Sequence, residues 1–244
     1  MQSTVGERGT WEPRAAWTMK DGELHVLSFD EGAEGDGSGA GPGLAGGWET
    51  GREEAGPGRL RALLGRVLGR PAEEVPLVRD QYGRPRLEGL PIGLCVCRDD
   101  GRLIVALAHR MTVAVSAHCV PEVFSSAAFL PFTPRERQLV DTVQEPQQPW
   151  LLARLWARKE AALRLWGPGR LSLADEVDAL PGGRGGAVLV PDPVPGSGHA
   201  PRSAYVVDLP AAAPGWVVSA ATSAPPHTVR TWRVGRTAPE AVMA

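Results

Sequence analysis

The sequence has little cysteine, no long hydrophobic run and no apolar segment at its start. Three cysteines among 244 residues cannot form a disulfide framework, so a disulfide-stabilised small protein is excluded. No apolar run approaches the roughly eighteen residues that a membrane helix needs. The first fourteen residues are polar and do not resemble a secretory signal. We therefore expect a cytoplasmic protein without a membrane partner.

An excess of charge is also absent, since 26 basic and 28 acidic residues give a formal net charge of −2. This balance gives no support to nucleic acid as a partner. A chain of 244 residues is long enough to bury a core as one large domain or two small ones. Lysine is rare, and Lys20 and Lys159 are its two occurrences, so a lysine within a motif stands out.

Glycine is concentrated in residues 31–48, where the composition cannot bury enough apolar surface to offset ordering. We expect a flexible loop there. Beyond it, leucines and a valine at helical spacing predict a helix over residues 58–69. Short apolar runs bounded by turns predict strands at 24–29, 77–78, 92–97, 103–108, 112–119, 187–190, 204–209, 216–221 and 229–234. The pair Asp100-Gly101 suits a hairpin turn.

Two more helices are expected between these strands. Thr133, Pro134 and Glu136 form a capping-box start with proline at the first helical position. A longer helix is expected over residues 150–166, ending at Gly167. Helix followed by strands thus occurs twice, which predicts an α+β fold of two halves, residues 1–112 and 113–244.

The long helix carries a charged residue on its apolar side. Glu160 lies four residues after Trp156 and three before Leu163, so its carboxylate shares the apolar stripe. A buried carboxylate needs a cation, a metal ion or hydrogen-bond donors. A structural ion pair and a functional carboxylate are both compatible with this position.

Residues 156–161 resemble the W-x-x-K-E-A signature of the 4′-phosphopantetheinyl transferases of the surfactin-synthetase-activating type. Four other segments, in the expected order, resemble further motifs of that family. They are residues 82–85 (the G-K-P turn), 132–137 (F-S-P-x-E-R), 167–173 (the G-x-G-L loop) and 214–221 (the P-G-Y strand). The resemblance spans residues 60–221, and its specificity comes from the combination of segments.

The resemblance implies two similar α/β halves in a pseudo-twofold arrangement, with coenzyme A in the cleft between them. It also implies a magnesium ion at the diphosphate, a carrier-protein serine that accepts the phosphopantetheine arm, and a monomer. Lys159, Arg164 and Arg84 match positions that hold lysine in the family, and phosphate contacts are expected from them. Lys159 is also a candidate catalytic residue, with Ser116, His118 and Glu160. Arg61, on the basic face of the first predicted helix, is a further candidate for coenzyme A phosphates.

The sequence departs from the family at the metal site. Ser116 and His118 stand where relatives have an aspartate and a second acidic residue, so Glu160 is the one family ligand that survives. A hydroxyl and an imidazole are poor ligands for Mg²⁺, which prefers carboxylate and water oxygens. Val96 replaces the histidine that meets a coenzyme A phosphate in relatives. We therefore expect magnesium only if conventional activity is retained.

Ser116 and His118 are two residues apart on a predicted strand and so project from one face, which in the family looks at the helix glutamate. We expect them to converge with Glu160. The three could act as nucleophile, base and orienting carboxylate for acyl transfer, or His118 and Glu160 could exchange protons with a substrate held by its pantetheine arm. A former metal site without chemistry is the third interpretation.

Cys95 and Cys97 also share a strand face, and with His118 nearby they raise the question of zinc. Small buried hydrophobic residues are the alternative explanation.

Three functions therefore stay open. The favoured one is a transferase-like protein that binds coenzyme A or a carrier-protein-tethered phosphopantetheine thioester in polyketide or peptide natural product biosynthesis, with metal-independent chemistry at His118 and Glu160. The others are a conventional magnesium-dependent transferase and a catalytically silent scaffold that binds an acyl or peptidyl carrier protein.

Overall fold

The computed structural model describes residues 4–10, 19–30, 57–99, 102–120, 130–167, 170–180, 185–192, 200–210 and 213–234. The predicted flexible loop at residues 31–48 and the Asp100-Gly101 turn lie outside these ranges. Within them, no helix is long and apolar enough to cross a membrane.

The three predicted helices are present close to their predicted bounds, as α1 (Pro57–Leu68), α2 (Pro134–Thr142) and α3 (Gln148–Leu165). The predicted capping box is confirmed at the start of α2, where Thr133 accepts a hydrogen bond from the backbone of Glu136 and the Glu136 carboxylate accepts one in return. Short 3-10 helices occupy Ala72–Glu74 (η1), Glu145–Gln147 (η3) and Arg170–Glu176 (η4).

The predicted strands are also present, and two more accompany them. The strands are β1 (Thr4–Thr10), β2 (Glu23–Asp30), β3 (Leu77–Arg79), β4 (Pro85–Leu87), β5 (Ile92–Asp99), β6 (Arg102–His109), β7 (Val113–Cys119), β8 (Gly185–Val190), β9 (Arg202–Leu209), β10 (Trp216–Thr222) and β11 (Thr228–Val234). The sequence pattern did not predict β1 or β4. β1 (TVGERGT) lacks the apolar–polar alternation of a half-buried strand, and β4, with three residues, is too short to show a pattern.

The described strands form a five-stranded sheet in the order β1-β11-β2-β6-β5, a four-stranded sheet in the order β7-β10-β9-β8, and the hairpin β3-β4. β11 is parallel to both of its neighbours, whereas the other pairs are antiparallel. This mixture of helices and sheets agrees with the α+β class. The last strand returns to the sheet of the first strands, so the division after residue 112 and the pseudo-twofold relation stay predictions.

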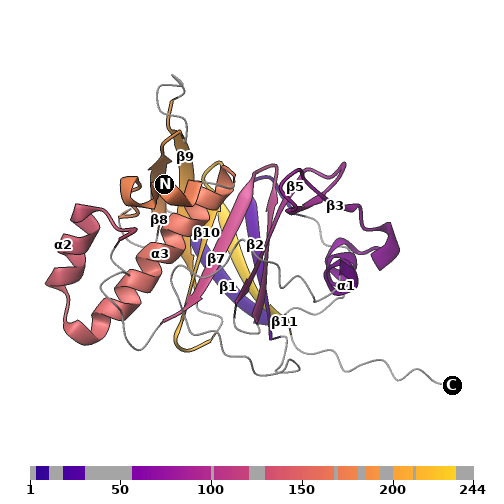
Figure 1. Cartoon of the computed structure of the whole chain (residues 1–244). Coiled ribbons are helices and arrows are strands. Elements are labelled where there is room, and N and C mark those ends of the chain that lie inside the picture. The colour runs from indigo at the N-terminus through magenta and orange to yellow at the C-terminus, as the bar shows by residue number, and fades with distance from the viewer. Residues whose placement is uncertain are drawn as a thin grey trace.

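The two larger sheets pack against each other, and each is covered by helix on its outer face (Figure 1). α1 covers the five-stranded sheet, and α3 crosses the four-stranded sheet with α2 beside it. β7 shows how the alternation of a strand fixes the layers. Val113, Val115 and Ala117 are buried between the sheets, and Ala114 packs in the cluster with α3. Ser116 and His118 therefore face α3.

Candidate functional site

Ser116 and His118 of β7 meet Glu160 of α3. Nε2 of His118 lies 2.7 Å from Oε2 of Glu160 and 2.9 Å from Oγ of Ser116. The Ser116 hydroxyl donates a hydrogen bond to the same Oε2. The structure thus brings together the three side chains that were expected to converge.

Arg164, one helical turn after Glu160, completes this group, which we call the Glu160 cluster (Ser116, His118, Glu160 and Arg164). A terminal nitrogen of Arg164 lies 2.8 Å from Oε1 of Glu160. The i,i+4 spacing of a glutamate and an arginine is a visible signal for this pair, and the sequence interpretation missed it. Ser116 is completely buried, whereas the side chains of His118 and Arg164 are 24% and 30% exposed. The cluster therefore reaches solvent through these two residues.

The cluster holds Glu160 as an anion. Burial alone raises the pKa of this carboxyl, but the hydrogen bond from His118, the charge of Arg164 and the hydrogen bond from Ser116 outweigh it and lower the pKa to about 2. An ionised carboxylate only accepts hydrogen bonds, so Nε2 of His118 must carry the shared hydrogen. Among the described residues, Nδ1 of His118 has no hydrogen-bond partner. A neutral ring thus keeps its lone pair on Nδ1.

The contacts differ from those of a serine nucleophile with a histidine base. In such a relay the imidazole stands between hydroxyl and carboxylate and uses one nitrogen for each. Here Nε2 of His118 faces both groups, and the hydroxyl of Ser116 donates directly to Glu160. The arrangement favours the pair of His118 and Glu160 over a Ser-His-Glu relay.

The cluster does not fit a magnesium ion. Glu160 is its one carboxylate, and both oxygens already accept from protein donors. Arg164 adds a positive charge within hydrogen-bond distance, which disfavours a second cation. Across the described part of the chain, no group of three or more His, Cys, Asp and Glu residues could hold a metal ion.

Cys95 and Cys97 have contacts of another kind. Sγ of Cys95 accepts a hydrogen bond from the backbone nitrogen of Val115 at 3.4 Å, and Sγ of Cys97 lies 4.0 Å from Arg164. Burial raises the pKa of both thiols, that of Cys97 to about 12. Cys97 is buried in the hydrophobic cluster between the sheets and Cys95 packs against that cluster, which favours the interpretation as packing residues.

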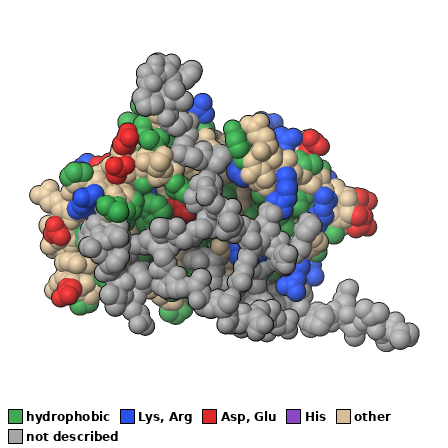
Figure 2. Space-filling view, in the orientation of Figure 1, with side chains coloured by type: hydrophobic (Ala, Val, Ile, Leu, Met, Phe, Trp, Pro, Cys, Tyr) green, Lys and Arg blue, Asp and Glu red, His purple; other side chains and the backbone are tan. Residues whose placement is uncertain are grey.

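A cavity of about 940 Å³ lies beside the cluster. Its walls come from the β3-β4 hairpin, from β5, from the start of β7 and from the end of α3. Arginine is its dominant charged residue, contributed by Arg84, Arg86, Arg98, Arg110 and Arg164. Among the described lining residues, Asp80 is the one carboxylate, and it pairs with Arg84 at 2.7 Å. On the face of the molecule that Figure 2 shows, many of the basic side chains lie over α1, β3 and β5.

The residues predicted to bind phosphate fall into separate places. Arg84 and Arg164 line the cavity. Arg61 donates hydrogen bonds to the carbonyl oxygens of Val75 and Leu77 at 2.7 and 2.8 Å. Its guanidinium therefore ties α1 to the segment that leads into β3. No sequence signal identifies such backbone acceptors, because they are brought near by the turn after the helix.

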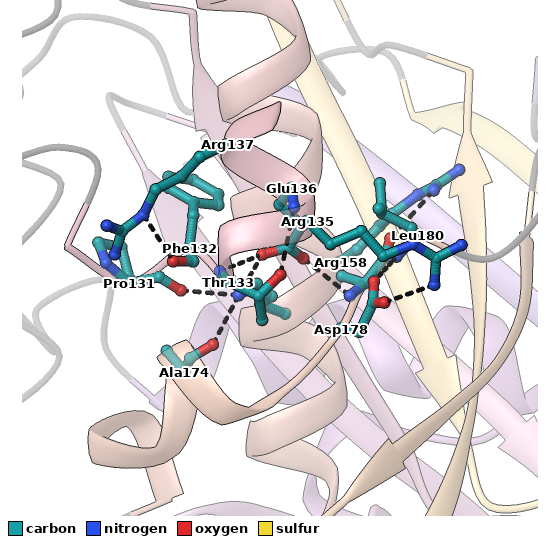
Figure 3. A network of polar contacts seen from close by, with 12 residues as sticks. Pro131, Phe132, Thr133, Arg135, Glu136, Arg137, Arg158, Ala174, Asp178 and Leu180 are labelled. Carbon is teal, nitrogen blue, oxygen red and sulfur yellow. Dashed lines mark hydrogen bonds and ion pairs between the residues drawn. The ribbon is translucent and has the colours of Figure 1, made fainter. Parts of the chain in front are cut away.

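Lys159 lies in a different network from Glu160, because consecutive residues of a helix point about 100° apart. Its Nζ lies 2.6 Å from Oε2 of Glu136 and donates to the carbonyl oxygens of Pro131 and Ala174 at 2.7 and 2.6 Å. Figure 3 shows Glu136, Pro131 and Ala174 around this point. The three ammonium hydrogens are thus matched by three acceptors. The structure does not bring Lys159 to the Glu160 cluster.

A family model for the 4′-phosphopantetheinyl transferase superfamily matches residues 119–200. This is about a third of the chain, and it contains α2, α3 and β8, with Glu160 and Arg164. Ser116 and His118 precede the matched range. No curated protein is significantly similar to the chain.

Proposed function

We propose that the chain is a transferase-like protein of the surfactin-synthetase-activating type that binds coenzyme A, or a carrier-protein-tethered phosphopantetheine thioester, in the cavity beside the Glu160 cluster. The similarity of residues 119–200 to the transferase superfamily supports the substrate class. The observation that carries the proposal is the position of Arg164, which lines the cavity and also pairs with Glu160. A ligand in the cavity can therefore reach the cluster through Arg164, the one cluster residue among the lining residues.

The lining of the cavity suits such a ligand. Guanidinium groups bind phosphate with two parallel hydrogen bonds, and Arg84 and Arg164 offer two of them. The side chains of Ile92, Leu94 and Val96 supply an apolar wall for a thin pantetheine arm. The volume of about 940 Å³ lies within the range of small-molecule and cofactor sites.

In this proposal His118 is the acid–base residue and Glu160 is a positioning residue. Glu160 holds Nε2 of His118, which fixes the tautomer and leaves Nδ1 to accept a proton. A carboxyl with a pKa of about 2 is itself a poor base at neutral pH. Ser116 supports the carboxylate from the strand. The chemistry is metal-independent acid–base or acyl chemistry on a thioester of a polyketide or peptide pathway.

Calorimetric titration with coenzyme A tests the binding step. The wild-type chain is expected to bind, and Arg164→Gln and Arg84→Gln are each expected to bind at least about tenfold more weakly, since each loses a charged hydrogen-bond donor. Arg135→Gln is the matched control, because Arg135 is 74% exposed and lies outside this cavity. Absence of binding to both coenzyme A and a phosphopantetheine-bearing carrier protein would overturn the proposal.

A conventional magnesium-dependent transferase is the second candidate, favoured by the family match over α3. Incubation of an apo carrier protein with coenzyme A and Mg²⁺, followed by intact mass measurement, distinguishes it. A gain of one phosphopantetheine arm supports this candidate. If His118→Ala and Glu160→Gln leave the pathway product unchanged while deletion of the gene abolishes it, the result would instead indicate a silent scaffold.

A further inference from the structure

We infer that Arg164 is the resident cation of this site and that its guanidinium, held by Glu160, meets the ligand's phosphate where relatives use a divalent metal ion. Ligand binding then does not depend on a metal ion. The identity of the ligand rests on the proposed function, whereas the absence of a divalent site at Glu160 does not.

The hydrogen bonds of Glu160 and the charge of Arg164 disfavour a metal ion at this carboxylate. Oε1 is 2.8 Å from Arg164, and Oε2 accepts from His118 at 2.7 Å and from Ser116. A metal ion on Oε2 would have to displace His118 or Ser116, and one on the remaining lone pair of Oε1 would lie beside the Arg164 guanidinium. If it displaced Arg164, a guanidinium would lose its anion while a divalent charge approached it, which Coulomb repulsion opposes.

The strands under α3 place no carboxylate on β7 or β10 next to Glu160. On the face of β7 that looks at α3, the residues are Ala114, Ser116 and His118. Ser219 of β10 is the register partner of Ser116, and Asp208 of β9 is the register partner of Ser219. Asp208 is therefore the first carboxylate along this row.

Asp208 is already paired. Its Oδ2 lies 2.6 Å from nitrogens of both Arg154 and Arg158, and its Oδ1 accepts from Ser219 at 3.1 Å. A carboxylate held by two arginines and a hydroxyl is not free to move toward Glu160. The described part of the chain thus gives Glu160 no acidic partner.

Arg164 meets the requirements of a phosphate-binding cation. Its side chain is 30% exposed and lines the cavity, and Glu160 accepts from one terminal nitrogen. A guanidinium has five N–H donors, so others remain for a ligand. Glu160 sets the direction of the guanidinium, and His118 and Ser116 in turn hold Glu160. The contacts among these four residues thus fix the orientation of the Arg164 guanidinium.

Titration of the full chain with Mn²⁺, followed by electron paramagnetic resonance, tests the cation claim without any ligand. The wild type is expected to show no saturable Mn²⁺ site tighter than roughly 1 mM, the weak end of oxygen-ligand sites. The double variant Ser116→Asp/His118→Glu, folded as judged by circular dichroism, is expected to bind Mn²⁺ at least about tenfold more tightly, because it adds two carboxylates beside Glu160. Saturable wild-type binding that Glu160→Gln abolishes would overturn the inference.

Calorimetry with coenzyme A in EDTA and in MgCl₂ tests the consequence for the ligand. The wild-type affinity is expected to agree within about twofold between the buffers, and Arg164→Gln is expected to lose at least about tenfold in both. Arg164→Lys should recover part of that loss, and Arg135→Gln should bind as the wild type does. Binding that requires MgCl₂ would overturn the inference and leave the proposed function intact. If coenzyme A binds in neither buffer and a phosphopantetheine-bearing carrier protein does not bind either, the proposed function is overturned, and the Mn²⁺ titration then decides whether Glu160 holds a divalent ion.

Discussion

The ammonium group of Lys159 lies 2.6 Å from the carboxylate of Glu136, and both side chains are completely buried. The same carboxylate accepts hydrogen bonds from the backbone nitrogens of Thr133 and Ala179, each at 2.8 Å. One ion pair thus fastens α3 to the start of α2 and to the segment after η4. The resemblance implies a phosphate contact for Lys159, whereas these contacts give it a structural role.

Lys159→Met is expected to destabilise the protein by about 3–5 kcal/mol, because it leaves Glu136 buried without its cation. Urea denaturation measures this change. The double variant Lys159→Met/Glu136→Gln should recover part of the loss, since no uncompensated charge stays buried. Below the unfolding transition, Lys159→Met should bind coenzyme A as the wild type does. A loss of affinity of tenfold or more would contradict a purely structural role and support a phosphate contact for Lys159.

The convergence of Ser116, His118 and Glu160 could be predicted because it depends on regular geometry. Two residues of the same parity on a strand share a face, and the family motifs indicate which helix that face meets. The start of α2 was predictable for the same reason, since Thr133 and Glu136 satisfy each other's backbone within one turn.

Contacts between distant segments could not be predicted in this way. Arg61 was expected at phosphates, but its acceptors are the carbonyl oxygens of Val75 and Leu77, which become neighbours only after the chain turns back. The parallel pairing of β11 with β1 and β2 joins the two ends of the described chain and leaves no local pattern.

Glu160→Gln is expected to remove a pH-dependent stabilisation. The pKa of Glu160 falls from 4.5 to about 2 on folding, so the stabilisation is complete above about pH 4.5 and is lost as the pH falls toward 2. A change of this size corresponds to about 3 kcal/mol at neutral pH. Urea denaturation between pH 7 and 3.5 gives the free energy of unfolding of the wild type and of the variant. The difference between these two free energies should decrease as the pH falls.

Glu145→Gln serves as the matched control for this experiment, because Glu145 is an exposed carboxylate in η3. The free energy of unfolding of Glu145→Gln should equal that of the wild type at every pH. A Glu160→Gln difference that is constant or grows on acidification would contradict the pairing of Glu160 with His118 and Arg164.

His25 is buried between Trp232 and Glu23, and its burial favours the neutral ring. Nδ1 accepts a hydrogen bond from Nε1 of Trp232 at 3.2 Å, and Nε2 lies 3.3 Å from the carboxylate of Glu23. A proton added to Nδ1 would face the indole N–H. Burial lowers the pKa of His25, although the hydrogen bond and charge of Glu23 oppose this. The contribution of the neutral His25 ring to the free energy of unfolding should therefore be fully present above the ordinary histidine pKa of 6.5. It should decrease as the pH falls below that value.

Thermal melts between pH 8 and 5.5 test this dependence on His25. The melting temperature of the wild type should fall across the range, and His25→Gln should fall less because it cannot titrate. His227→Gln, at an exposed histidine, should follow the wild type. A pH titration followed by NMR that places the pKa of His25 at or above 6.5 would refute the prediction.

Gly93 allows β5 to approach the start of β7 at the wall of the cavity. A Cβ at this position would lie 2.2 Å from the carbonyl oxygen of Met111, far inside contact distance. Gly93→Ala must therefore push β5 away from Met111, and overpacking of this kind costs about 1–3 kcal/mol. Because both residues line the cavity, we also expect weaker binding of coenzyme A.

Chemical denaturation and calorimetry measure the two effects of Gly93→Ala, with Gly58→Ala as the matched control. A Cβ at Gly58 in α1 would meet nothing within 4 Å, so this variant should keep its ligand affinity. It should also gain up to about 1 kcal/mol of stability, since alanine is the better helix former. If Gly93→Ala were as stable as the wild type and bound coenzyme A equally well, β5 and Met111 could not be packed as closely as the structure has them, and the cavity wall would have to lie elsewhere.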